Sequence, residues 1–201
     1  MTAIEPLLVI RPIKPTPELP GDLAMWFFIL AELAVFALLL GSMAFVRGSW
    51  PEMFSAGVAT LHPIAGLINT LTLLTGSYWV ALGVAAMRRG QATQVVWWFR
   101  AGAASGLLYL IIKTVEYQQM FSAGYTLRTN TFYFFYFFTT FFHLMHVVLG
   151  MVILLVVATR FRKGLYNSPA TRQMAAESAA SYWHMVDLVW LMLFPLLYVL
   201  P

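Results

Sequence analysis

The chain has 201 residues, of which 61% are hydrophobic and only 10% are charged, and its formal net charge is +4. Soluble domains carry roughly 25% charged residues, so this composition excludes a water-soluble globule and indicates an integral membrane protein. An excess of Lys and Arg in such a protein sets its topology, so we expect no nucleic-acid partner. The lack of cysteine excludes disulfides, iron–sulfur clusters and cysteine-ligated copper or zinc.

The first 21 residues contain prolines at positions 6, 12, 15, 17 and 20. Proline fixes an extended backbone, and the short apolar run Leu7–Ile10 is too brief for the core of a signal peptide. The sequence therefore predicts an exposed, proline-rich arm over residues 1–21. A single membrane domain is predicted to follow over residues 22–201.

A membrane-spanning helix needs about 20 mostly apolar residues. The segments that meet this requirement are residues 22–46, 62–87, 96–121, 132–159 and 182–200. Asp22 is a predicted N-cap after Pro20-Gly21, and Pro63 suits the first turn of a helix. Because the connections are short, we predict one all-α bundle of five transmembrane helices.

The distribution of Lys and Arg predicts which way the bundle is inserted. With five spans, the arm and the second and fourth loops share one side and hold nine of these residues when Arg100, at the start of the third span, is counted with them, whereas the first and third loops hold only Arg47 and Arg128. Cytoplasmic loops carry the excess of positive charge. The N-terminus is therefore predicted to be cytoplasmic and the C-terminus periplasmic.

Ionisable side chains occur inside the predicted spans, where each costs a few kcal/mol by insertion scales and needs a partner. At about 1.5 Å per residue, Glu32 lies near the midplane, and His143 and His146 reach a compatible depth from the other face. We expect these three side chains to form an interior polar cluster.

The last span carries His184 and Asp187, which are three residues apart and share a helix face. They are expected to form a second cluster, a turn or two from the cytoplasm. Lys113 and Glu116 repeat this spacing near the outer end of the third span. We expect them to form an ion pair that partly snorkels towards the interface.

The pair His143-x-x-His146 raises the question of a metal or haem. A lone metal there, with Glu32 as the third ligand, is the alternative to simple polar pairing. The chain has four histidines, whereas a binuclear haem–copper centre with a second haem needs about six. We therefore predict no haem, no metal site and no catalytic residue in this chain.

Four stretches in order resemble cytochrome c oxidase subunit III. The similarity extends over nearly all of the chain from residue 22 onward. The stretches are Trp26–Phe36 (like WFFxSExxxF), Asn69–Thr75 (like NTxLLLTS), Phe142–Gly150 (like FHGLHVxxG) and Tyr182–Trp190 (like YWHFVDxVW). Glu116-Tyr117 also matches the glutamate of a helix in that family.

This resemblance implies a non-catalytic subunit in the inner membrane of a bacterium. Its partner would be a catalytic subunit that holds haem, with or without copper or non-haem iron. The resemblance also implies phospholipid bound near Glu32, and support of assembly or sustained turnover.

The five-span form is similar to subunit III of quinol oxidases and to the accessory protein of nitric oxide reductase. Asp22–Trp26, Arg88-Arg89-Gly90 and Phe194–Tyr198 look most like the latter group, so we expect a role in denitrification. The first alternative is subunit III of an aerobic cytochrome c or quinol oxidase. Two further alternatives are a quinol-binding subunit that uses the aromatic run 132–138 and a small proton-coupled transporter.

Overall fold

The computed structural model describes residues 20–200, so the predicted arm lies almost wholly outside the described residues. Within them the secondary structure is helical throughout. The helices are α1 (Leu23–Ser49), α2 (Pro51–Val58), α3 (Pro63–Arg88), α4 (Ala92–Ser122), α5 (Thr131–Arg162) and α6 (Pro169–Phe194), followed by the π-helical turn η1 (Pro195–Val199). Five of them, α1, α3, α4, α5 and α6 with its η1 extension, are long and apolar enough to cross a membrane. The predicted all-α membrane bundle is therefore confirmed.

Local sequence explains where these helices begin. The Asp22 side chain accepts a hydrogen bond from the backbone N–H of Ala24 at 3.2 Å, which confirms the predicted N-cap of α1. Pro63 opens α3, where its missing N–H costs nothing. Asn130 caps α5 through the N–H of Tyr133, and Ser168 begins α6 with a reciprocal capping box.

The prediction for the last helix was wrong at its start, because α6 begins at Pro169 and not at Tyr182. The segment from Pro169 to Ser181 is too polar to be predicted as part of a membrane span. Its alanines and its N-cap nevertheless favour a helix. His184 and Asp187 consequently lie 15 and 18 residues into α6, farther along the helix than expected. The short helix α2 in the first loop was also not predicted.

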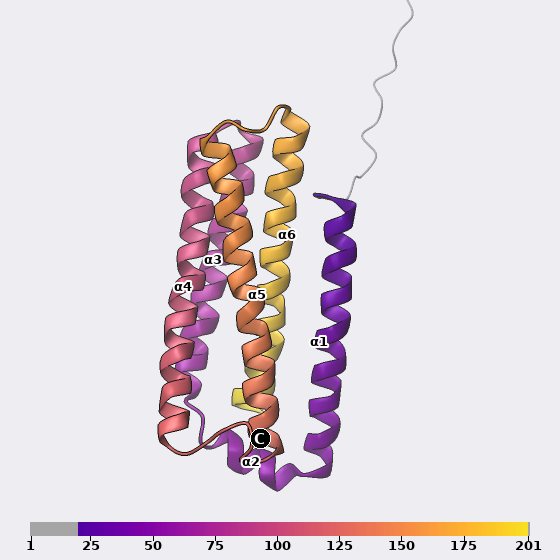
Figure 1. The fold of residues 1–201 in the computed structure, drawn as a ribbon, viewed down its shortest axis with the longest axis vertical. Helices are drawn as coiled ribbons and strands as arrows, with labels where there is room; N and C mark the ends of the chain where they lie inside the picture. The colour runs from indigo at the N-terminus through magenta and orange to yellow at the C-terminus, as the bar shows by residue number, and fades with distance from the viewer. Residues whose placement is uncertain (1–19, 201) are drawn as a thin grey trace, which may run out of the picture.

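Helices α3, α4, α5 and α6 form a closely packed bundle, and α1 stands beside it (Figure 1). Helix α1 packs mainly on α6 and connects through α2, which lies across the end of the bundle. The core between the four helices is aromatic. Its largest fully buried side chains include Trp183, Trp190, Tyr109, Tyr136 and Phe99.

Small residues in the first two spans could serve packing inside the bundle or docking to another protein. In the structure those of α3 are buried inside the bundle, whereas several of those on α1 are exposed. Gly66, Gly76 and Gly83 on α3 are buried against side chains of α6 and α4. In lipid, such residues let helices approach closely. On α1, by contrast, Ala37 and Gly41 are exposed, and a Cβ added at Gly41 would meet nothing within 4 Å.

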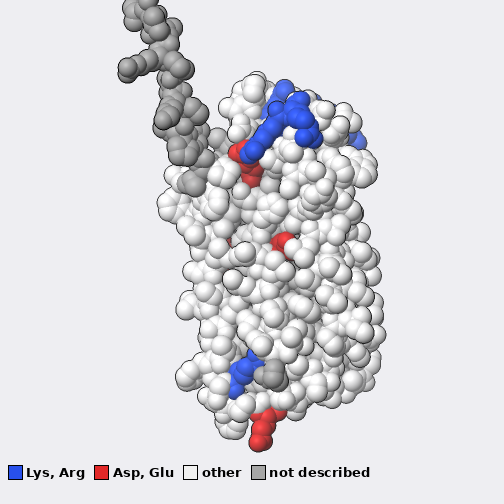
Figure 2. Space-filling model, turned by 180° about the vertical axis from the view of Figure 1, so that it is seen from behind, with Lys and Arg blue, Asp and Glu red and all other residues white. Residues whose placement is uncertain are grey.

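Basic side chains gather at one end of the molecule (Figure 2). Arg88, Arg162 and Arg172 lie there, at the α3–α4 and α5–α6 connections, and Gly21 is tied to α6 at the same end. Arg47 lies at the opposite end, beside the last residues of η1. We propose that the basic end faces the cytoplasm, following the positive-inside rule.

This orientation predicts which loops are open to the periplasm. The chain has no cysteine, so Leu127→Cys and Lys163→Cys each introduce a single thiol, on opposite sides. In intact spheroplasts a membrane-impermeant maleimide is expected to label the Leu127→Cys variant and to leave the Lys163→Cys variant unlabelled until the membrane is broken. The reverse pattern would mean that the N-terminus is periplasmic.

Candidate functional site

A fully buried ion pair lies in the half of the bundle opposite the basic end. Lys113 Nζ is 3.1 Å from Glu116 Oε2, and the two side chains are 0% and 2% exposed. The predicted ion pair is therefore present, but the snorkelling expected of it is not. Snorkelling is unnecessary because α5 and the end of α6 bring polar groups to the pair.

Two tyrosines complete this cluster, and each bonds both charged groups. The ammonium of Lys113 donates to the hydroxyls of Tyr136 at 3.1 Å and Tyr198 at 2.5 Å. These hydroxyls donate in turn to Glu116 Oε1, at 2.9 and 2.7 Å respectively. Lys113 Nζ also lies over the rings of Tyr136 and Tyr198. A buried ion pair is tolerated only when further hydrogen bonds satisfy both charges, as they do here.

The end of the chain delivers Tyr198 to this cluster. Pro195 cannot donate to the helical hydrogen-bond ladder, and at this position α6 widens into the π-helical turn η1. The guanidinium of Arg47 on α1 donates to the carbonyl of Leu200 at 2.6 Å. The last turn is thus held between α1 and the buried ion pair.

A second polar contact joins α1 to α5 inside the membrane. Glu32 Oε2 lies 2.9 Å from His146 Nε2, and His146 Nδ1 lies 2.7 Å from the carbonyl oxygen of Phe142. The ring of Phe36 packs on that of His146 at 5.2 Å between centroids. This pair is less enclosed than the first, because the Glu32 side chain is 20% exposed.

The geometry of His146 limits where its protons can be. A carbonyl oxygen only accepts, so Nδ1 must donate to Phe142. Nε2 then either accepts from a protonated Glu32 or, in an imidazolium, donates to the Glu32 carboxylate. Both states leave the pair with no net charge, which is the condition that makes it cheap to place in lipid.

His143, expected in the same cluster, is not bonded to Glu32. Its ring is fully buried and packs against Tyr109 and Trp190, and neither ring nitrogen has a hydrogen-bond partner within residues 20–200. The two histidines are three residues apart, which falls short of a full helical turn by about 60°. His143 therefore points away from His146, towards the bundle centre. The expected three-residue cluster is thus a Glu32–His146 pair plus a separate core histidine.

His184 and Asp187 do not bond to each other. His184 Nδ1 lies 3.1 Å from Ser77 Oγ on α3, and His184 as a residue is exposed. Asp187 is only 6% exposed, and its Oδ1 has no hydrogen-bond partner in the described part of the chain. This second site is therefore incompletely satisfied, unlike the Lys113–Glu116 cluster.

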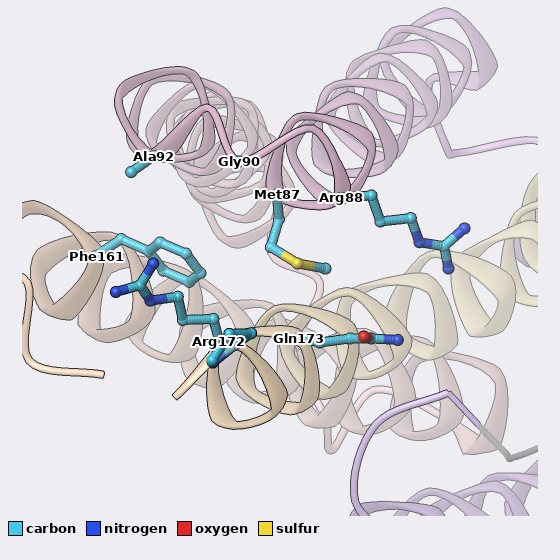
Figure 3. A pocket seen from close by; sticks show the side chains of 8 residues that line it. Met87, Arg88, Gly90, Ala92, Phe161, Arg172 and Gln173 are labelled. Atoms are coloured by element: carbon cyan, nitrogen blue, oxygen red, sulfur yellow. The ribbon is translucent and has the colours of Figure 1, made fainter. Parts of the chain in front are cut away.

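A pocket of about 400 Å³ opens at the basic end, between the α3–α4 turn and the start of α6. Arg88 and Arg172 lie on opposite sides of it, with Met87 and Gln173 between them and Phe161 beside Arg172 (Figure 3). Arg88 is paired with Glu177 at 3.1 Å, and Arg172 donates to the carbonyl of Tyr166. Both arginines have intramolecular partners, and the pocket lining has no His, Asp or Glu that could act as a general acid or base.

The polar groups of the described chain form no recognisable catalytic arrangement. Residues 20–200 contain no group of three or more His, Asp and Glu side chains that could hold a metal. The suggested metal at His143 and His146 with Glu32 lacks the required convergence, because His143 points away. What the arrangement can do chemically is hold charges and one shared proton inside the membrane.

Sequence reasoning missed the partners that complete these sites. Tyr136 and Tyr198 belong to an aromatic run and a C-terminal apolar segment, where their hydroxyls carry no spacing signal. Glu177 was also missed; it accepts from the backbone N–H of Gly21 and from Arg88. Within the aromatic run 132–138, five rings are buried and only Phe134 and Phe138 reach the surface.

The fold and these sites define a polytopic membrane bundle in which Lys113 pairs with Glu116 and Glu32 pairs with His146. The family model for cytochrome c oxidase subunit III matches residues 22–200. The chain therefore belongs to the cytochrome c oxidase subunit III family. Subunit III is a non-catalytic accessory subunit that associates with the catalytic subunit I of haem–copper oxidases.

Individual relatives agree with this family. The chain is 32% identical to cytochrome c oxidase subunit 3 of Thermostichus vulcanus, over 89% of this chain and 86% of the relative. It is 33% identical to the same subunit of a Synechocystis species, over 89% of this chain and 76% of the relative. A 27% identical match covers 87% of this chain and 22% of an Aeropyrum pernix protein named haem–copper oxidase subunit I+III. With the five apolar helices, the bacterial relatives make this a multi-pass bacterial membrane protein.

These relatives bear on which oxidoreductase the chain serves. Two of them carry the name cytochrome c oxidase subunit 3. The expected assignment to nitric oxide reductase finds no support in them, and the aerobic alternative fits them better.

The buried ion pair predicts a large penalty for breaking it. Lys113→Met leaves Glu116 without its counter-ion in the core and is expected to lower the free energy of unfolding by roughly 3–5 kcal/mol. Adding Glu116→Gln removes the stranded charge, so the double variant is expected to recover much of the loss. Reversible unfolding in detergent measures both. Arg88→Met, at a pair whose arginine side chain is 64% exposed, is the control, and it should cost at most about 1 kcal/mol. Equal losses for Lys113→Met and Arg88→Met would contradict the role of burial.

Proposed function

We propose that this chain is subunit III of a bacterial haem–copper oxidase that reduces oxygen, and that it binds laterally to the catalytic subunit in the membrane. The observation that carries the proposal is the family match over residues 22–200, together with the relatives named cytochrome c oxidase subunit 3. In the Aeropyrum pernix relative, subunits I and III share one chain, which supports a direct lateral association.

The interior of the bundle supports a structural role in this complex. The charges of Lys113 and Glu116 are neutralised by each other and by tyrosines, and Glu32 is neutralised by His146. Haem and copper would belong to the partner, and electrons would not pass through this chain. The function proposed is support of assembly and of sustained turnover.

The Glu32–His146 pair is the candidate for lipid contact. It joins α1 to the bundle at a point where the carboxyl remains partly exposed, and α1 presents large apolar side chains such as Phe27 and Phe45. A phospholipid beside α1 would cover this polar contact with acyl chain and keep its proton from exchange. We propose that the pair holds α1 in place while lipid fills the surrounding surface.

Purification of the native complex tests the function directly. A tag on this chain, extracted from its native membranes in mild detergent, is expected to bring down a haem-containing subunit with oxygen-reducing activity. Reduced-minus-oxidised spectra identify the haems, and oxygen and nitric oxide consumption identify the reaction. Recovery of a complex that consumes nitric oxide and not oxygen would replace the proposal with the nitric oxide reductase assignment. Recovery of no haem subunit would overturn it.

Loss of the α1–α5 contact should affect durability and not the redox centres. Glu32→Ala leaves His146 without its partner and is expected to shorten the period of steady turnover at least twofold, with haem spectra unchanged. Glu32→Gln, which keeps a hydrogen bond to the imidazole, is the matched control and should lie between Ala and the native residue. Altered haem spectra in Glu32→Ala would instead place Glu32 in the electron path.

A further inference from the structure

Arg100 is a charged residue of a membrane-spanning helix that faces outward. Helix α4 begins at Ala92, so Arg100 lies eight residues into the helix and not in the loop before it. The residue is exposed on the surface of the bundle. Charged side chains within membrane spans almost always face the protein interior or pair with another group. An outward-facing guanidinium therefore needs a partner from outside the bundle, unless a neighbouring acid supplies one.

The acids of residues 20–200 do not supply this partner. The ion pairs in that part of the chain include neither Arg100 nor Arg162, the last residue of α5. The only acid of α4 is Glu116, which belongs to the buried ion-pair cluster, and α5 has none. At the basic end, Asp22 caps α1 and Glu177 belongs to another ion pair. Both guanidinium groups thus keep their positive charge uncompensated by these acids.

Arg100 and Arg162 line one pocket of about 360 Å³ between α4 and the end of α5. Both residues are exposed, and Trp97, which also lines the pocket, is 61% exposed. The buried residues Val96 and Phe161 make part of the lining apolar. The neighbouring pocket in Figure 3 differs, because its two arginines are engaged by a glutamate and by a backbone carbonyl. The α4–α5 pocket thus offers two guanidinium groups beside apolar side chains.

The height of this pocket matches the phosphate layer of a bilayer. Helix α4 has 31 residues, so it is about 46 Å long and, when centred, extends roughly 8 Å beyond each side of the hydrocarbon core. Arg100 lies about 12 Å from the basic end of α4, and its long side chain can snorkel outward to the boundary. Arg162 ends a helix of similar length and reaches the headgroup region. Exposed tryptophans such as Trp97 are typical of the same level.

Apolar side chains continue from this pocket into the membrane. Leu107 and Ile111 lie seven and eleven residues after Arg100 on the same face of α4, and they are 51% and 54% exposed. Leu155 lies seven residues before Arg162 on α5 and is 42% exposed. Helix α4 stands on the side of the bundle away from α1 (Figure 1), so this surface is separate from the polar contact on α1. It suits acyl chains that descend from a headgroup held at the pocket.

We propose that the α4–α5 pocket binds an anionic phospholipid, with its phosphate between the guanidinium groups of Arg100 and Arg162 and its acyl chains along α4 and α5. Guanidinium groups bind phosphate oxygens in bidentate fashion, and basic pockets between transmembrane helices on the cytoplasmic side recognise such headgroups. Two cations favour a headgroup of net negative charge, as in phosphatidylglycerol or cardiolipin, over a zwitterionic one. A lipid is favoured over a carboxylate of another protein, because the bilayer itself supplies phosphates at this height. Such a site would not depend on which oxidoreductase the chain serves.

Lipid titration of the purified, delipidated full chain tests this site. Native mass spectrometry measures the tightest binding of dioleoylphosphatidylglycerol, with dioleoylphosphatidylcholine as the zwitterionic probe, and we expect at least tenfold tighter binding of the former. The double variant Arg100→Gln and Arg162→Gln should raise the dissociation constant for phosphatidylglycerol at least tenfold and leave that for phosphatidylcholine unchanged. The matched control, Arg89→Gln with Arg172→Gln, removes the same charge from exposed positions at the basic end that do not line this pocket. It should change the dissociation constant less than twofold.

Equal losses in the pocket variant and in the control variant would overturn the proposal, as would equal binding of the two lipids by the native chain. The melting temperature of the lipid-free pocket variant should stay within about two degrees of the native value, because both arginines are exposed. If the double variant does not fold, Arg100→Gln and Arg162→Gln are measured singly. Each should then weaken phosphatidylglycerol at least threefold, and no loss in either would overturn the site.

Photo-crosslinking in native membranes distinguishes a lipid from a protein at this surface. A benzophenone amino acid replaces Leu107, which is 51% exposed and follows Arg100 on the same face of α4. We expect adducts with phospholipid, identified by mass spectrometry, and no adduct with a protein. A major adduct with another subunit or with a second copy of this chain would mean that protein covers the pocket, and the lipid assignment would be wrong.

Discussion

The lipid interior offers no water, so each charge placed there must find its counter-charge and its hydrogen bonds within protein. The Lys113–Glu116 pair meets both requirements in this chain. Two charges on α4 are joined by hydroxyls from α5 and from the last turn of the chain. Three segments are thereby fixed to one another away from the basic end. The position of η1, and with it the contact to Arg47 on α1, depends on this cluster.

The three polar sites differ in how completely they satisfy this requirement. The Lys113–Glu116 cluster is closed within the bundle. The Glu32–His146 pair is neutral but partly exposed, at the junction with α1. The Asp187 carboxyl has a buried oxygen without a partner in the described residues, as do both ring nitrogens of His143. This order runs from the most to the least completely satisfied site in the described residues.

Membership in the subunit III family gives this order its biological meaning. An accessory subunit without a redox centre contributes through its surfaces and its durability. Its interior then needs to stay neutral over many turnovers, and one face must match the catalytic subunit. The proposed assignment to an oxygen-reducing enzyme comes from the relatives, since the interior sites would serve an oxygen or a nitric oxide reductase equally well.

The sequence by itself determined the membrane class, the five spans and the start of α1 at Asp22, because composition, apolar length and capping are local properties. The family also followed from the ordered motifs. The start of α6 was misplaced from the sequence, since a polar, alanine-rich helix gives no hydropathy signal. Only the tertiary structure decided that Tyr136 and Tyr198 close the ion pair, that His143 turns away from Glu32, and that Asp187 keeps a free oxygen. These outcomes depend on helix rotation and on contacts between residues up to 114 positions apart, which no local pattern encodes.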